Sequence, residues 1–325
     1  METIYVNYMS QQPHISQILC GFHMLDKEKY HVVLQEKQPT PPNGIKLPAA
    51  VEVIFQGRTL IYDLDDGYQH MDGIRYLLNT CDLYFKRSFS EKKNQAFLNE
   101  YKDKMHPLGF NYHVTYKEDP LNKPPRLRQR IKALLGYKQM SCFTYDLFEY
   151  KPDGRKKPCR ILFYTRLWEP SDKFPPLVNK KRETINTMRI EIIRTLREKY
   201  GRQFLGGVQK SALAKKICPD LILPYHKTDR SRYLRTLHKS DICIGTMGLH
   251  ESIGWKTGEY VAAGKHYLPF ASAHACVSAV DRLVNDAALR EQMQKNNRDY
   301  YEAYLQPRVL VENTLRLAAQ KLADI

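Results

Sequence analysis

The chain has 325 residues, which is long for a single hydrophobic core, so we expect two domains. Its 42% hydrophobic and 26% charged residues are typical of a globular protein and exclude extensive disorder. Lysine and arginine outnumber aspartate and glutamate by 51 to 35, and the formal charge of +16 favours polyanionic partners or substrates: nucleic acid, anionic membrane or nucleotide-containing molecules.

The first half of the chain alternates short apolar runs with helical patterns, which predicts an α/β fold with parallel sheets covered by helices. We predict strands at residues 3–6, 51–55, 59–63, 83–86 and 110–114. A polar stretch at 150–158 interrupts the pattern, and the linker is expected near 151–157. The first domain therefore spans residues 1–155.

The second half begins with a buried-strand pattern at 160–166 that ends in Arg166. An amphipathic helix follows over 185–196 and ends near Gly201, and a strand is predicted at 203–208. Ligands collect at the carboxyl ends of strands in open α/β sheets, so a guanidinium at Arg166 is well placed to bind a diphosphate.

The carboxyl-terminal part reads as helix, with one helix around residues 285–293 and a final one over 309–322. We expect a second domain at 156–305 and a last helical segment at 306–325.

The seven cysteines are scattered, without a C-x-x-C pair, which argues against a disulfide framework and a zinc site. The amino terminus lacks a basic segment followed by an apolar one, and no apolar run approaches the ~18 residues of a membrane-spanning helix. We therefore expect a cytoplasmic protein, with a peripheral position on the inner face of the plasma membrane as a second option.

The most informative motif places Glu251 and Glu259 eight positions apart, with Gly254 and Gly258 between them. Eight helical residues turn a side chain by about 80°, so a segment running from a loop into a helix lets both carboxylates address one ligand. The glycines leave room for a phosphate, and the helix start offers free N–H groups to it. The plainer alternative is a pair of solvated glutamates with turn glycines.

This segment resembles the E-x7-E motif of retaining glycosyltransferases with the GT-B fold, especially family 4. The residues in register are Glu251, Gly254, Glu259, Ala262 and Gly264. The strand at 240–245 is similar to the family strand that precedes the motif, and the resemblance covers roughly 158–305. It implies two Rossmann-like domains facing a cleft, a final helix crossing back, and a nucleotide-diphosphate sugar as donor substrate without a further cofactor.

The resemblance also implies roles for individual residues. Glu251 would orient the donor sugar and Glu259 would bind the ribose. Arg166, Lys256 and the helix start at Gly254 and Gly258 would stabilise the departing diphosphate in place of a metal. The usual Arg-x-x-x-Lys-Gly pair of the family is incomplete here, and Lys173 and Lys180 are candidate replacements.

Candidates for the acceptor side follow two predicted strands of the first domain. They are Asp65, Asp66, His70, Lys86 and Arg87. For His70, and equally for His113, the alternative to a contact with the acceptor is a purely structural role. Asp63 and Asp65 form a D-x-D triplet, the pattern with which other glycosyltransferases hold a divalent ion. Such triplets are frequent and Asp is common as a cap, so we expect no metal site here.

A basic amphipathic pattern covers residues 126–135, with four cations opposite an apolar face. It predicts either a contact with anionic membrane or an ordinary surface helix.

The expected function is transfer of a sugar from a nucleotide-diphosphate sugar to a saccharide or lipid-linked acceptor, with retention of configuration, in polysaccharide or glycolipid synthesis. The alternatives are a nucleotide-sugar epimerase or hydrolase of the same fold, or a basic nucleic-acid-binding or scaffold protein. No zinc finger, RNP motif or leucine zipper is present, so no specific nucleic acid is expected as partner. The nucleotide base, sugar, acceptor, linkage and oligomeric state stay open.

Overall fold

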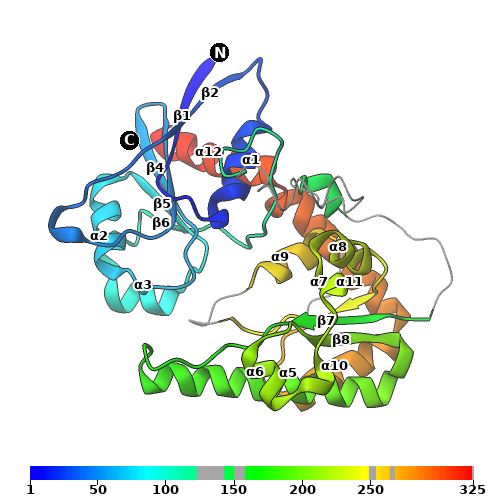
Figure 1. Cartoon of the computed structure of the whole chain (residues 1–325). Helices are drawn as coiled ribbons and strands as arrows, with labels where there is room; N and C mark the ends of the chain where they lie inside the picture. The colour runs from blue at the N-terminus through cyan, green and yellow to red at the C-terminus, as the bar shows by residue number, and fades with distance from the viewer. Residues whose placement is uncertain (123–142, 150–157, 249–253, 264–267, 324–325) are drawn as a thin grey trace, which may run out of the picture. The chain divides into compact units, whose positions relative to one another are not determined.

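The computed structural model describes residues 1–122, 143–149, 158–248, 254–263 and 268–323 (Figure 1). The chain divides into two compact units. Unit 1 comprises Met1–Asp146, His250–Gly258 and Tyr301–Ile325, and unit 2 comprises Leu147–Leu249 and Glu259–Tyr300. The predicted linker at 151–157 and the basic segment at 126–135 lie outside the described residues.

Unit 1 is built on a six-stranded sheet with the strand order β2-β1-β3-β4-β5-β6. The strands are β1 Glu2–Tyr8, β2 Tyr30–Glu36, β3 Ala50–Phe55, β4 Arg58–Asp63, β5 Leu83–Lys86 and β6 Met105–Pro107. Only β3 is antiparallel to its neighbours, whereas β1/β2, β4/β5 and β5/β6 pair in parallel. Five strands therefore run in one direction and end at the same edge of the sheet.

The prediction of purely parallel sheets is wrong for unit 1, and the cause is the turn between β3 and β4. Its two residues, Gln56 and Gly57, have φ angles of 50° and 73°. Two left-handed residues form the tight turn of an antiparallel hairpin, whereas a parallel connection needs a long crossover. The strands predicted at 51–55 and 59–63 are confirmed, but residues 110–114 form no strand.

Helices cover the sheet of unit 1 and connect its strands. They are α1 Ser16–His23, α2 Met71–Thr80, α3 Glu91–Phe97 and α12 Pro307–Ala323, with short helical turns η1 Pro13–Ile15, η2 Pro42–Gly44, η3 Asn99–Tyr101 and η8 Tyr301–Leu305. The turn η4, Tyr145–Leu147, contains the division between the units after Asp146. The final helix α12 packs on α1, where a Cβ on Gly21 would lie 2.3 Å from the carbonyl oxygen of Pro307. Tyr62 of β4 also hydrogen-bonds Thr314 of α12 at 2.6 Å.

Unit 2 contains a three-stranded parallel sheet in the order β8-β7-β9. The strands are β7 Ile161–Thr165, β8 Phe204–Val208 and β9 Ile242–Cys243. Its helices are α5 Pro176–Tyr200, α6 Ala212–Ile217, α7 Tyr225–Thr228, α8 Arg230–His238, α10 Ala273–Asn285 and α11 Ala287–Tyr300, with turns η5 Gly201–Gln203 and η6 Pro219–Leu221. Helix α9, Trp255–Ala262, contains the division between the units, after Gly258.

Alternate side chains of β7 cover the two faces of the sheet in unit 2. Ile161 and Phe163 join a core with Ile192 and Leu196 of α5 and Val280 of α10. Tyr164 points to the other face and hydrogen-bonds a threonine of α8, and Figure 1 shows α5 and α10 on one side of the strands and α8 on the other.

The strand order β8-β7-β9 has a consequence for ligand binding. The chain leaves β7 toward one side, forms β8, and returns to the other side of β7 as β9. The carboxyl ends of β7 and β9 thus mark the topological switch point, where ligands usually bind in open α/β sheets. The α/β class is confirmed. Among the described residues, no helix combines the length and hydropathy that crossing a bilayer requires.

Candidate functional site

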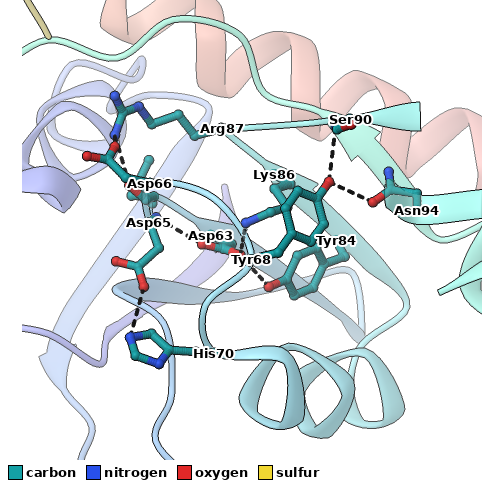
Figure 2. A network of polar contacts seen from close by, with 11 residues as sticks. Asp63, Asp65, Asp66, Tyr68, His70, Tyr84, Lys86, Arg87, Ser90 and Asn94 are labelled. Atoms are coloured by element: carbon teal, nitrogen blue, oxygen red, sulfur yellow. Dashed lines mark hydrogen bonds and ion pairs between the residues drawn. The ribbon is translucent and has the colours of Figure 1, made fainter. Parts of the chain in front are cut away.

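Polar side chains gather at the strand ends in both units, and the network in unit 1 centres on Asp63 (Figure 2). Asp63 ends β4 beside Lys86, its partner at the end of parallel β5. One carboxylate oxygen accepts hydrogen bonds from the Lys86 ammonium at 2.7 Å and from the Tyr84 hydroxyl at 2.6 Å. The other accepts the main-chain N–H of Asp65 at 2.9 Å. Neither Asp63 nor Lys86 is exposed, so Lys86 acts as a buried partner that orients Asp63.

A second pair, Asp65 and His70, lies next to this buried ion pair. The His70 Nε2 is 3.6 Å from a carboxylate oxygen of Asp65, and the two side chains are 19% and 13% exposed. Burial, with a smaller contribution from the Asp63 charge, raises the pKa of the Asp65 carboxyl above its usual range. This pair can therefore hold a proton or hydrogen-bond a hydroxyl group of a ligand.

Arg87 extends the network toward Asp66, with which its guanidinium forms an ion pair. The Arg87 side chain is 4% exposed, whereas that of Asp66 is 39% exposed. His14 lies near both residues. Burial lowers the pKa of its imidazole, the charge of Asp66 raises it, and the charge of Arg87 lowers it. The predicted acceptor-side residues Asp65, Asp66, His70, Lys86 and Arg87 are thus brought together at one edge of the sheet.

The first turn of α9 also belongs to unit 1. Trp255 contacts the rings of His14 and His113 at centroid distances of 4.6 Å and 5.3 Å. The two glycines of the motif differ in their surroundings. A Cβ on Gly258 would lie 2.6 Å from the main-chain oxygen of Asn111, whereas a Cβ on Gly254 would meet no atom within 4 Å.

Unit 2 presents a different arrangement, an arginine cluster at the switch point. Arg189 of α5 is 5% exposed and its guanidinium reaches the loops after both β7 and β9. It donates to the Arg166 carbonyl at 2.6 Å, to the Thr246 hydroxyl at 2.8 Å and to the Met247 carbonyl at 3.4 Å. Burial, with help from the charge of Arg166, lowers its pKa to about 10, so it stays charged near neutral pH.

Arg166 occupies the predicted place, directly after β7, and its side chain is exposed. Its guanidinium carbon lies 4.2 Å from the ring centroid of Trp168, and Arg189 and Arg182 stand 5.8 Å and 6.0 Å from the same ring. Within the described residues, none of these three arginines forms an ion pair with a carboxylate. Lys173 is exposed in the loop that follows, before α5.

Glu259 lies in the second turn of α9 and belongs to unit 2. Only 1% exposed, it has both carboxylate oxygens engaged, one by Arg230 at 2.9 Å and one by the Tyr233 hydroxyl at 2.9 Å. A ribose would have to replace one of these partners. Glu251 and Gly264 lie outside the described residues, and Lys256 is placed at the start of α9.

Sequence reasoning missed Arg189, although the sequence contains a signal for it. Arg189 follows Ile185 by four positions and precedes Ile192 by three, so it lies on the apolar face of the predicted helix. A cation on such a face is either paired with a carboxylate or bound to neutral oxygen atoms, and Arg189 binds two main-chain oxygens and the Thr246 hydroxyl.

No protein-family model and no curated protein matches this sequence. Within the described residues no group of three or more His, Cys, Asp or Glu side chains is arranged to hold a metal ion.

Proposed function

We propose that this protein is a glycosyltransferase of the GT-B type that moves a sugar from a nucleotide-diphosphate sugar to a saccharide or lipid-linked acceptor in the cytoplasm. The observation that carries the proposal is the arginine cluster of unit 2. Arg166 and Arg189 meet at the switch point of a parallel sheet, and no carboxylate among the described residues neutralises them.

The electrostatics of this cluster favour an anionic ligand. Buried charges in proteins are normally paired, because an uncompensated charge loses hydration without regaining it. Arg189 satisfies its donors with two carbonyl oxygens and a hydroxyl, which provide no opposite charge. A diphosphate bound beside Arg166 would supply that charge, in a crevice where ligands of α/β sheets collect.

Each residue of the cluster then has a distinct task. Arg166 forms no ion pair with a carboxylate among the described residues, so two parallel N–H groups can contact phosphate oxygens, and stacking on Trp168 limits the conformations of its side chain. Arg189 holds the loops after β7 and β9 at a fixed spacing. Lys173 adds an exposed positive charge nearby in the chain. Together they would stabilise the charge that develops on the leaving diphosphate, a role that elsewhere falls to a metal ion.

The carboxylates retain the roles that the family resemblance implies. Glu251 is proposed to orient the donor sugar, and Glu259 to bind the ribose after exchanging a partner. In unit 1, Asp65 and His70 are proposed to hydrogen-bond an acceptor hydroxyl, and the raised pKa of Asp65 suits a group that shares a proton. Lys86 contributes by holding Asp63 and the turn that begins at Asp65.

Thermal denaturation in the presence of UDP, GDP, ADP or a short DNA duplex tests the proposal, because a ligand that binds only the native state raises its melting temperature. We expect at least one nucleotide diphosphate to stabilise the parent protein and the duplex to have no comparable effect. Mass spectrometry of donor sugars with an acceptor mixture and excess EDTA then follows transfer. Stabilisation by the duplex alone would favour a nucleic-acid-binding protein, and donor consumption without acceptor would favour a hydrolase.

A further inference from the structure

The edge of the unit 1 sheet carries a second feature, a cavity beyond the ends of β1 and β2. Its volume is about 300 Å³, at the lower end of the range for small-molecule sites. This open depression is lined by Met9 and Gln11 from the loop after β1, by Gln38 and Pro41 after β2, and by Ile45 before β3. The cavity thus lies where parallel strands end, on unit 1 alone.

Three exposed polar side chains at this cavity hydrogen-bond to one another. The amides of Gln11 and Gln38 both donate to the same oxygen of Glu36, at 3.1 Å and 3.2 Å. This leaves the second oxygen of Glu36 and the amide carbonyl oxygens to accept hydrogen bonds, and the second amide N–H groups to donate them. Met9, Pro41 and Ile45 provide an apolar surface beside this group.

The charges at the cavity discriminate between classes of ligand. Lys37 lines it too, but its ammonium is held by both oxygens of Glu52, at 2.6 Å and 2.8 Å. Because Glu52 neutralises the charge of Lys37, the carboxylate of Glu36 repels a phosphate. A purely apolar ligand would give the remaining polar atoms of Gln11, Glu36 and Gln38 no hydrogen-bond partner. A neutral ring with several hydroxyl groups on one side and C–H groups on the other matches both surfaces.

We infer that this cavity binds one ring of a neutral saccharide, through hydrogen bonds to Gln11, Glu36 and Gln38. Because β1, β2, β4 and β5 end at the same edge, the cavity and the Asp65–His70 pair share that edge, and β3 separates them. Strands lie about 4.8 Å apart, so β1 and β4 are separated by roughly 10 Å, a span that an oligosaccharide bridges. The inference deepens the proposed function. The binding of a saccharide at this cavity does not depend on that function, and only the assignment of the saccharide as acceptor rests on it.

Saturation-transfer difference NMR with glucose, galactose and N-acetylglucosamine tests the site, with phosphate and lysine as charged comparison ligands. At least one neutral sugar should give transfer signals with the parent protein. The signals should fall at least five-fold in Ile45→Trp, which places a larger ring in the cavity, and in the double variant Glu36→Gln, Gln38→Ala. Glu28→Gln changes an exposed carboxylate elsewhere in unit 1 and should match the parent.

Absence of sugar signals in the parent, equal signals in the cavity variants, or signals from lysine or phosphate alone would overturn the inference. A UDP, GDP and ADP titration on the same samples separates the two proposals. A parent protein that binds a nucleotide but no sugar refutes only the cavity, and a parent protein that binds a sugar but no nucleotide refutes only the diphosphate site.

Discussion

The guanidinium of Arg189 donates a hydrogen bond of 2.6 Å to the main-chain oxygen of Arg166, so a buried arginine fixes the loop that carries an exposed one. The same guanidinium bonds Thr246 and Met247 in the loop after β9. A single side chain thus sets the geometry of both loops at the switch point of unit 2.

We predict that Arg189→Met weakens binding of a nucleotide diphosphate by about one to two decades, because the loops that position Arg166 lose hydrogen bonds from a charged group worth about 1.5–3 kcal/mol. Arg189→Lys keeps the charge but lacks the planar fork that reaches both loops, so it should recover only part of the affinity. Calorimetric titration measures both variants. Full affinity in a folded Arg189→Met protein would show that the loops need no such support.

The ion pair of Lys86 and Asp63 predicts a large loss of stability when one partner is removed. Lys86→Met leaves a buried carboxylate uncompensated and should lower the free energy of unfolding by about 3–5 kcal/mol, measured by urea denaturation. Arg58→Met removes one partner of the half-exposed pair with Asp82 and should cost at most about 1 kcal/mol. Similar losses of stability in the two variants would contradict the claim that the Lys86–Asp63 ion pair is buried.

Asp119 predicts a pH dependence of stability in unit 1. This carboxyl is 3% exposed, one oxygen accepts the Leu121 N–H at 2.9 Å, and the other has no partner among the described residues. Burial raises its pKa from 3.8 to about 6. The native state therefore holds the proton more tightly than the unfolded state, and the free energy of unfolding falls as pH rises from about 4 to about 6.

Asp119→Asn keeps an acceptor for Leu121 and removes the titration. We expect this variant to exceed the parent in stability by about 1–2 kcal/mol at pH 7 and to equal it near pH 4, after allowance for solvent screening. Denaturation at both pH values decides the point. A variant less stable than the parent at pH 7 would mean that the carboxylate has a favourable role.

The two motif glycines should respond differently to substitution by alanine. A Cβ at Gly258 collides with the Asn111 carbonyl, so Gly258→Ala should lower the melting temperature and cost about 1–3 kcal/mol. Gly254→Ala meets no neighbour, and should leave stability within about 1 kcal/mol while reducing nucleotide affinity if a phosphate approaches this backbone. Thermal denaturation and titration of both proteins check this. An unaltered affinity for Gly254→Ala would remove Gly254 from the site.

Most strands could be predicted from the sequence because their apolar runs are short and bounded by polar segments, as in β4 and β7. Two strands of unit 1, β2 Tyr30–Glu36 and β6 Met105–Pro107, were missed. The direction of β3 could have been read from Gln56-Gly57, but glutamine rarely adopts a left-handed conformation and gives a weak turn signal. Residues 110–114 look like a strand, yet Tyr112 gives its N–H to the Gln17 side chain instead of to a neighbouring strand.

The candidate site was predictable where it depends on position along a strand, as for Arg166. It was not predictable where it depends on register between strands. Lys86 follows an apolar run and looked available to a ligand, but the pairing of β4 with β5 places it opposite Asp63. Such pairing joins residues far apart in the chain, and local patterns contain no information about it.

The central claim is that the arginine cluster of unit 2 binds a diphosphate, and calorimetric titration of UDP, GDP and ADP into the parent, Arg166→Ala and Arg202→Ala tests it most directly. Arg202 is also exposed but precedes β8, at the opposite edge of the sheet. We expect at least one nucleotide to bind the parent and Arg202→Ala equally, and to bind Arg166→Ala at least tenfold more weakly. Binding of none of the three nucleotides to the parent, or equal affinity for a folded Arg166→Ala protein, would contradict the claim.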